Sequence, residues 1–370
     1  MSWLPLEGVR VVDFSMFVPG PFCSSILADL GAEVIKVEPP RGDPGRSYVP
    51  VQFRTENRNK RAIAIDLKNS LSREIVGRLV AKADVVIEGF RPGVAKRLGI
   101  DYDSLKKYKG GLVYCSISGY GQTGPWKDRP GHDVNYVAAA GALAFPGGWL
   151  KAPARSSLPV ADMAGGSFAA IAILAALKEG KGAYLDLSLF EAAFFMAAMR
   201  HGLDDGADPR AHIFPVNDVF ECADGARLTL GVLEEHFWQN FVKLVPELAD
   251  RRFASDASRR ANGDELSSLL ERKFKERTST QWVDLCEAND VPVDLCLTPA
   301  QSAKLPQMQQ RKAASGGFAT FPVFANGARG GELRGGVPTL GEHAREILVE
   351  LGFDDSGIAD MVRHGVLAQP

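Results

Sequence analysis

Short apolar runs alternate with longer amphipathic segments along the first half of the chain. The runs at 9–14, 33–38, 62–67, 84–90 and 112–118 are short and rich in Val and Ile, as buried strands are. Segments 21–32 and 70–83 place their apolar residues at helical spacing, and Gly31 marks the expected end of the first. Strands and helices in this alternation predict an α/β fold, in which helices flank both faces of a mostly parallel sheet.

The pattern changes after Ala161. The stretch "DMAGGSFAAIAILAALKEGKG" (162–182) predicts a long buried helix with Asp162 at the N-cap position and Gly180 near its end. Residues 183–189 return to a strand pattern, and residues 190–203 return to a helical one.

The second half predicts a smaller α+β arrangement. Residues 218–233 have the pattern of a β-hairpin whose turn is Asp224-Gly225. Helical segments follow at 234–245, 263–277 and 279–289, and two more lie within 340–367. The stretch 203–212, which contains Asp, Gly and Pro, is interpreted as the linker between the two arrangements.

The composition excludes several classes of protein. The 370 residues are 45% hydrophobic and 24% charged, which is typical of soluble globular proteins. The net charge of -2 gives no overall field that would attract nucleic acid or an anionic membrane. The N-terminus lacks the pattern of a signal peptide, and the apolar runs are too short to span a bilayer. We therefore expect a cytoplasmic protein with neither nucleic-acid nor membrane partners.

The cysteines do not indicate a disulfide framework or a metal site. They are odd in number and scattered, no CxxC pair occurs, and the six His do not cluster with them at ligand spacing. We expect buried, reduced thiols and no metal, at Cys23, Cys115, Cys222, Cys286 and Cys296.

A glycine-rich stretch follows the strand predicted at 112–118. "GYGQTG" (119–124) satisfies GxGxxG, but Pro125 and Pro130 follow it, so the last glycine does not open a helix. We therefore favour a glycine-rich loop over a nicotinamide-dinucleotide site. A loop at the carboxyl end of a strand can still contact a ligand.

Basic residues lie at or near the ends of several of the predicted strands. Each group by itself is explained by a solvated helix face, whereas guanidinium and ammonium groups gathered at one sheet edge also suit phosphate. In a chain of net charge -2 they indicate a local anion site for a polyphosphate ligand, and they are Lys36, Arg41, Arg58, Lys60, Arg61, Lys68, Arg91, Lys96 and Arg97.

Three further residues have both a structural and a chemical interpretation. Asp162 is either a helix cap or a reactive carboxylate that the helix dipole keeps ionised. His132 either starts a helix or acts as an acid/base group, and Glu234 stands where acids commonly open helices. Local patterns leave these alternatives open.

Taken together, these motifs resemble the family III CoA-transferase superfamily (CaiB/BaiF type), over nearly the whole chain. The resemblance is carried by "LPLEGVRVVDFSMFVPGPFCSSILADLGAEVIKVEPP", "NRNKRAIAIDLK", "DVVIEGFRPGVAKRLGIDYDSL", "SGYGQTGPWKDRPGHDVNY", "PVADMAGGSFAAIAILAAL" and "KGAYLDLSLFEAAF", in this order. Within the superfamily, "GHDVNY" (131–136) is most similar to α-methylacyl-CoA racemases, because transferases usually lack the His that matches His132. The poly-glycine loop of formyl-CoA transferases is also absent before the predicted hairpin.

The resemblance implies a mechanism. His132 and Asp162 would be two bases on opposite sides of the α-carbon of a 2-methylacyl-CoA thioester, and Glu234 would orient the imidazole. Free N–H groups at the start of the Asp162 helix would stabilise the enolate. The alternative is a CoA transferase in which Asp162 is a nucleophile that forms an anhydride and His132 has no role. A third hypothesis is a non-catalytic acyl-CoA-binding protein.

The resemblance also implies the ligand contacts and the assembly. Many relatives have an Arg where this chain has Pro39, so Arg41 or Lys36 would take over a phosphate contact. CoA is part of the substrate, and no metal, flavin or nicotinamide cofactor is implied. An interlocked homodimer is expected, with a large Rossmann-like CoA-binding domain (1–202), a small α+β domain (203–325) and a C-terminal segment (326–370) that returns to the large domain. The implied CoA contacts are Arg41, Ile65, Lys68, Gly89, Phe90, Arg91, Arg97, Gly131, Asp133, Asn135 and Tyr136.

Overall fold

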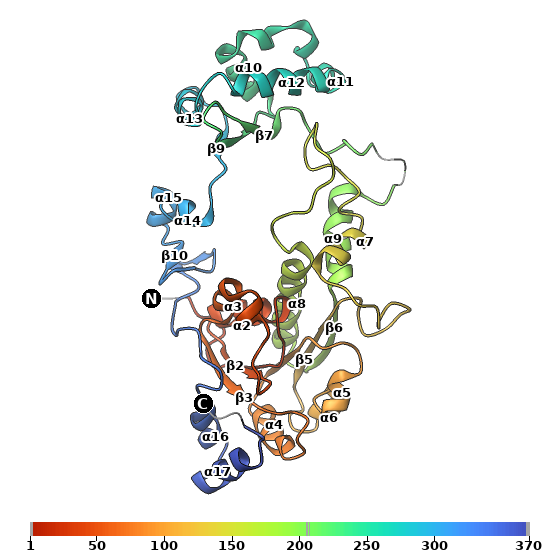
Figure 1. Ribbon diagram of the computed structural model, residues 1–370, viewed down its shortest axis with the longest axis vertical. Helices are drawn as coiled ribbons and strands as arrows, with labels where there is room; N and C mark the ends of the chain where they lie inside the picture. Colours follow the sequence, from red (N-terminus) through yellow and green to blue (C-terminus); the bar gives the residue numbers. More distant parts are fainter. Residues whose placement is uncertain (1–2, 205, 207, 368–370) are drawn as a thin grey trace. The chain divides into compact units, whose positions relative to one another are not determined.

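A six-stranded parallel sheet lies at the centre of the larger of two compact units (Figure 1). In this computed structural model, which describes residues 3–204, 206 and 208–367, the strand order is β3-β2-β1-β4-β5-β6. All carboxyl ends of the strands therefore lie at one edge, and the order reverses between β1 and β4, where open α/β sheets bind ligands. The predicted parallel sheet is confirmed, and its strands are β1 (Arg10–Asp13), β2 (Glu33–Glu38), β3 (Lys60–Ala64), β4 (Val85–Glu88), β5 (Val113–Ser118) and β6 (Ala183–Ser188).

The strands alternate their side chains between two helical layers. Val12, Ile35 and Ile63 pack into a core with α4, α16 and α17. Asp13 and Lys60 instead face α1, to which their side chains are hydrogen-bonded. The helices of the larger unit are α1 (Pro19–Asp29), α2 (Gly45–Tyr48), α3 (Pro50–Asn57), α4 (Ser72–Ala81), α5 (Val94–Leu98), α6 (Tyr102–Leu105), α7 (Asp133–Ala139), α8 (Val160–Glu179), α15 (Pro306–Gln310), α16 (Ala344–Glu350) and α17 (Asp355–Arg363). Helix α9 (Leu189–His201) begins in this unit, and its residues after Met196 belong to the smaller one.

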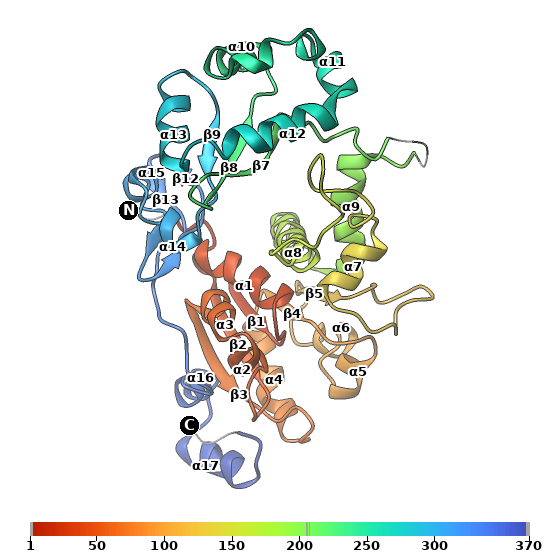
Figure 2. The same cartoon turned by 45° about the horizontal axis from the view of Figure 1, so that its top comes forward.

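Helix α8 lies beside α1 because a glycine permits the contact (Figure 2). A Cβ at Gly166 would lie 2.7 Å from the carbonyl oxygen of Pro19 and 2.8 Å from the ring of Phe22. By length and mean hydropathy, α8 would suffice to cross a membrane, contrary to the expectation that every apolar run is too short. Length and mean hydropathy alone do not distinguish a membrane span from a core helix, and in this structure α8 packs on β5 and β6.

The smaller unit contains an antiparallel sheet and a helical layer. The predicted hairpin with its Asp224-Gly225 turn is confirmed as β7 (Asn217–Glu221) and β8 (Arg227–Gly231), and β9 (Val293–Leu295) pairs with β8. The core is aromatic, with Trp238, Phe274 and Trp282 fully buried. The helices are α10 (Glu235–Leu244), α11 (Asp256–Ala261), α12 (Gly263–Phe274), α13 (Ser279–Glu287) and α14 (Pro299–Ser302), with 3-10 turns at Pro246–Ala249 and Arg251–Phe253.

The compact units divide the chain at different residues from the sequence-based domains. The larger unit contains Met1–Ala140, Ser156–Met196 and Pro306–Pro370, and the smaller contains Gly141–Arg155 and Ala197–Leu305. Segment 141–155 joins the smaller unit because Trp149 lies directly over Gly263 and its indole N–H donates to Asp264 at 2.8 Å. Segment 306–325 joins the larger unit, where Phe318 stacks on Arg58.

Four short strands follow α15 in the chain. Two small hairpins follow α15, β10 (Ala314–Ser315) with β11 (Phe318–Ala319) and β12 (Phe324–Ala325) with β13 (Ala328–Arg329).

All five cysteines are free thiols, and four are buried as expected, whereas Cys296 is exposed.

Candidate active site

The first turns of α7 and α8 meet through a carboxylate. Asp133, the first residue of α7, is buried, and its Oδ1 accepts hydrogen bonds from the backbone N–H of Ala161 (2.7 Å) and Asp162 (3.3 Å). The prediction that Asp162 is the N-cap is wrong, because α8 begins at Val160 and its N-cap residue, Pro159, has no side-chain cap. Asp133 caps α8 instead. It also takes up two of the N–H groups that were expected to stabilise an enolate.

The carboxyl group of Asp162 is only partly accessible. Burial and, to a smaller extent, the nearby Asp133 carboxylate together raise the pKa of Asp162 to about 7. At neutral pH both the protonated and the ionised form of Asp162 are therefore populated. Once ionised, this carboxylate is a stronger base and nucleophile than an ordinary aspartate.

Tyr136 fixes the loop around this carboxyl. Its hydroxyl donates to the carbonyl oxygen of Gly131 at 2.6 Å. A Cβ at Gly119 or Gly131 would lie within 2.6 Å of the Tyr136 side chain, so both positions need glycine. Burial, the charge of Asp162 and neighbouring Tyr120 raise the pKa of Tyr136 to about 12. Of the predicted contacts in 131–136, Asp133 and Tyr136 thus lie near Asp162, and the "GYGQTG" stretch is a loop, as expected.

His132 and Glu234 are both N-cap residues with exposed side chains. His132 precedes α7, and its backbone N–H donates to Asn135 Oδ1 at 3.0 Å. It is adjacent in sequence to Asp133, the group that caps α8. Glu234 opens α10 in the smaller unit. Its contact with His132 stays a prediction.

A cavity with three cations lies past the ends of β3 and β4. Its volume is about 360 Å³, and Lys68, Arg73 and Arg97 line it together with Leu67, Asn69, Ser70, Val94 and Leu98. We call it the basic cavity. No described residue that lines it is acidic, and none of the three cations has an ion-pair partner in the described part of the chain. The structure thus brings Lys68 and Arg97 together, as the CoA assignment requires.

Sequence reasoning missed Arg73. It lies on the first turn of α4, where a basic residue has the appearance of a solvated helix face. The sequence did contain one indication that Arg73 could contact the ligand: it lies five residues after Lys68, beyond the end of the same strand. The other predicted contacts near this edge differ in accessibility: Gly89 and Arg91 are exposed, Phe90 is half-buried, and Ile65 is fully buried. Ile65 as a whole has no exposed surface, and its backbone N–H donates to the carbonyl oxygen of Glu38 at 2.8 Å, so this structure presents none of its atoms to a ligand.

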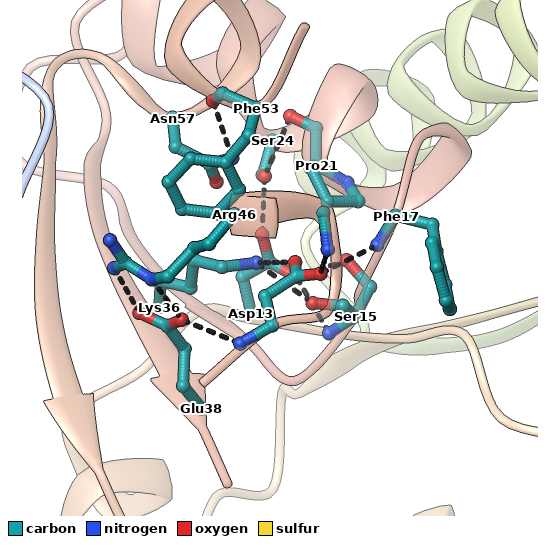
Figure 3. Close-up of polar contacts among 12 residues, drawn as sticks. Asp13, Ser15, Phe17, Pro21, Ser24, Lys36, Glu38, Arg46, Phe53 and Asn57 are labelled. Carbon is teal, nitrogen blue, oxygen red and sulfur yellow. Dashed lines mark hydrogen bonds and ion pairs between the residues drawn. The ribbon is translucent and has the colours of Figure 1, made fainter. Parts of the chain in front are cut away.

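Lys36 is not available to replace the missing Arg at position 39. Its ammonium is fully buried, lies 2.9 Å from Asp43 Oδ2 and donates to the carbonyl oxygen of Ser15 at 3.0 Å (Figure 3). Arg41 is exposed, so it remains the candidate for this phosphate contact.

Lys36 belongs to a group of paired side chains that we call the buried network: Asp13, Ser15, Ser24, Lys36, Asp43, Asn57 and Lys60. Lys60 Nζ donates to Ser24 Oγ (2.7 Å) and Asn57 Oδ1 (3.0 Å), and it lies 3.4 Å from Asp13 Oδ2. The backbone N–H of Phe17 donates to Asp43 Oδ1 at 3.2 Å, and Phe17 has a left-handed φ of 64°. The network therefore holds the β1–α1 loop in a strained conformation just before α1.

Two more of the predicted phosphate contacts are paired elsewhere. Arg58 pairs with Asp29, and Arg61 pairs with Glu33 and Glu350. No cluster of His, Cys, Asp and Glu that could hold a metal ion occurs among the described residues.

Comparisons with known proteins identify the family of this chain. The sequence model of CoA-transferase family III matches residues 6–344. The acetyl-CoA:oxalate CoA-transferase of Acetobacter aceti is 35% identical over 95% of this chain and 97% of its own length. The succinyl-CoA:glutarate CoA-transferase of Mus musculus is 32% identical over 100% of this chain and 91% of its own. A CaiB/BaiF family protein from Brucella suis superposes with a TM-score of 0.83 at 31% identity, covering 94% of this chain and 99% of its own.

Proposed function

Because the chain belongs to CoA-transferase family III, we propose that it moves CoA from an acyl-CoA thioester to a second carboxylic acid, with Asp162 as the nucleophile. The observation that carries this proposal is a half-buried carboxyl at the start of α8, beside the Asp133 cap, with a pKa of about 7. The relatives named above are transferases. They favour this proposal over the racemase that the His132 motif suggested.

The proposed reaction balances without a cofactor. Ionised Asp162 attacks the thioester carbonyl, the C–S bond breaks, and the CoA thiolate leaves a mixed anhydride on the enzyme. The thiolate then attacks the Asp162 carbonyl and displaces the first acid as its carboxylate. The second acid reverses these two steps, so that its own thioester forms and Asp162 returns to its ionised state. Lys68, Arg73 and Arg97 would hold the CoA phosphates during all four steps.

Transfer should require an acceptor and an ionised Asp162. We would incubate acetyl-CoA or succinyl-CoA with oxalate or glutarate, the groups in the names of the two relatives, and follow new thioesters by mass spectrometry. Asp162→Asn should lower the rate at least about 10³-fold, since the amide is not a nucleophile. Asp128→Asn, in an exposed loop, is the matched control. The wild-type rate should fall as the pH is lowered through about 7, because Asp162 becomes protonated.

The racemase remains a second candidate because His132 is adjacent to the residue that caps α8. It predicts deuterium at the α-carbon of 2-methylacyl-CoA thioesters in D2O without any acceptor acid. His132→Ala should then reduce exchange from one enantiomer far more than from the other. Exchange without an acceptor would support the racemase, and product that forms only with an acceptor supports the transferase.

We also propose a cytoplasmic homodimer. Several large apolar side chains of α9 are exposed in the single chain, among them Phe194, Phe195 and Met196. Clustered apolar exposure of this kind is typical of a surface that another subunit covers. Light scattering coupled to gel filtration should give twice the chain mass of 39.9 kDa.

A further inference from the structure

Asp133, the buried first residue of α7, is hydrogen-bonded to the residue that we propose as the nucleophile. Its side chain is 7% exposed. One oxygen, Oδ1, accepts the backbone N–H of Ala161 at 2.7 Å and the backbone N–H of Asp162 itself at 3.3 Å. The position of this single oxygen therefore constrains the backbone from which the Asp162 carboxyl extends.

No other described group caps the first turn of α8. The first N–H groups of a helix have no partner within the helix, and a side chain commonly supplies one. Pro159, the N-cap residue, provides no side-chain acceptor, and the N–H of Met163 already donates to the carbonyl oxygen of Pro159 at 2.9 Å. Without Asp133, the N–H groups of Ala161 and Asp162 would lose the acceptor that the described part of the chain gives them.

The turn that carries Asp133 is held by hydrogen bonds of its own. The backbone N–H of His132 donates to Asn135 Oδ1 at 3.0 Å, and the backbone N–H of Asn135 donates to the carbonyl oxygen of His132 at 2.8 Å. The Tyr136 hydroxyl donates to the carbonyl oxygen of Gly131 in the same turn. Helix α7 also packs against α8 (Figure 2). Asp133 is thus a fixed support for the start of α8.

The first turn of α8 is where such a support matters for catalysis. Helix ends fray, and Asp162 is only the third residue of its helix. A nucleophile must meet the thioester carbonyl in one geometry, and a displacement of about 1 Å can lower a rate about 100-fold. A cap that is bonded to the backbone of the nucleophile acts directly on this geometry.

We propose that Asp133 is a positioning residue for Asp162: through Oδ1 it holds the first turn of α8 against α7 and keeps the nucleophilic carboxyl in its attacking position. This inference rests on the proposed transfer function, in which Asp162 attacks the thioester. The reaction then depends on where the oxygen of residue 133 lies. The negative charge of Asp133 is dispensable.

Three substitutions separate the position of this oxygen from its charge. Asp133→Asn keeps an acceptor oxygen in place and loses the charge, so its kcat should stay within about fivefold of the wild type. Asp133→Glu keeps the charge but displaces the carboxylate by one methylene, so its kcat should fall more than about fivefold. Asp133→Ala removes the acceptor, and its kcat should fall about 100-fold. The KM of the acyl-CoA should change less than about twofold in all three.

The measurement is the steady-state rate of transfer, with a donor and acceptor pair that the transfer assay identifies. A pH of about 8.5 keeps Asp162 ionised in the wild type, so that a lowered pKa of Asp162 in Asp133→Asn does not change the rate. Circular dichroism shows whether each variant is folded. If Asp133→Ala does not fold, Asp133→Glu, which keeps a carboxylate in the turn, decides in its place.

Asp354→Ala is the matched control for the loss of a helix cap. Asp354 accepts the backbone N–H of Gly357 at 2.8 Å at the start of α17, a helix that carries none of the residues proposed for the reaction. This variant should have a lower melting temperature and an unchanged kcat. A loss of kcat in Asp354→Ala as large as in Asp133→Ala would attribute both losses to stability and overturn the positioning role.

The remaining outcomes separate this inference from the proposed function. A kcat within fivefold of the wild type in folded Asp133→Glu or Asp133→Ala, or a larger loss in Asp133→Asn, would overturn the role of Asp133 while Asp162→Asn still abolishes transfer. A raised acyl-CoA KM with an unchanged kcat would overturn it too, and would favour the CoA contact that the resemblance implies. A wild-type enzyme that forms no new thioester with any acceptor would overturn the proposed function itself.

Discussion

Two groups of cations lie within or just beyond the strands of the same sheet, and their surroundings differ. In the buried network, Lys36 and Lys60 are fully buried, and each is paired with an aspartate. In the basic cavity, Lys68, Arg73 and Arg97 are exposed to solvent and no described acid pairs with them. The comparison shows that a cation near a strand is available to a ligand only when the fold brings it no acid.

Strand geometry explains the difference. Lys36 pairs with Asp13 in the register between β1 and β2, on the face of the sheet that α1 covers. Lys68 lies four residues beyond the last residue of β3, where the chain has left the sheet. The first cation therefore stabilises the β1–α1 loop, and the others are free to bind phosphate.

The largest expected effect concerns the buried network. Lys36→Met leaves the fully buried Asp43 without its cation, and this should lower the free energy of unfolding by about 3–5 kcal/mol. Urea denaturation at pH 7 measures it. Lys178→Met, at an exposed position in the last turn of α8, is the control and should change stability by less than about 0.5 kcal/mol. If the two variants were equally stable, the network would have no structural role.

The basic cavity should show the opposite behaviour. Lys68→Gln, Arg73→Gln and Arg97→Gln should each raise the KM of the acyl-CoA about tenfold, because each removes a charged contact to phosphate. Stability and kcat should hardly change. Arg78→Gln, on the same helix as Arg73 but paired with Glu74, is the matched control. An unchanged KM in all three variants would show that CoA binds elsewhere.

A smaller effect is expected at Arg41. It is exposed on the loop after β2 and does not line the basic cavity, so Arg41→Gln should raise the acyl-CoA KM only about two- to threefold. A thioester of dephospho-CoA, which lacks the 3′-phosphate, shows whether that phosphate is its partner. If Arg41→Gln raised the acyl-CoA KM more than Arg97→Gln does, the main phosphate contact would lie after β2 and not in the basic cavity.

The sequence predicted the sheet and its main helices because these rest on local periodicity, as in β2 and α8. It also singled out Lys68 and Arg97, which the structure brings together in the basic cavity, whereas their contact with a ligand stays a prediction. It could not predict that Asp133 caps α8, since this hydrogen bond joins residues 28 apart in the chain. Nor could it show that Trp149 packs on Gly263, or that Lys36 is paired with Asp43. These contacts depend on tertiary packing, which leaves no periodic trace in the sequence.

The central claim is that Asp162 becomes covalently attached during transfer. The most direct measurement is mass spectrometry of the peptide that contains Asp162, after the enzyme has turned over acyl-CoA and been treated with hydroxylamine or borohydride. We predict a hydroxamate or an alcohol at Asp162 in the wild type and neither in Asp162→Asn. An unmodified Asp162 in an enzyme that still transfers CoA would contradict the account.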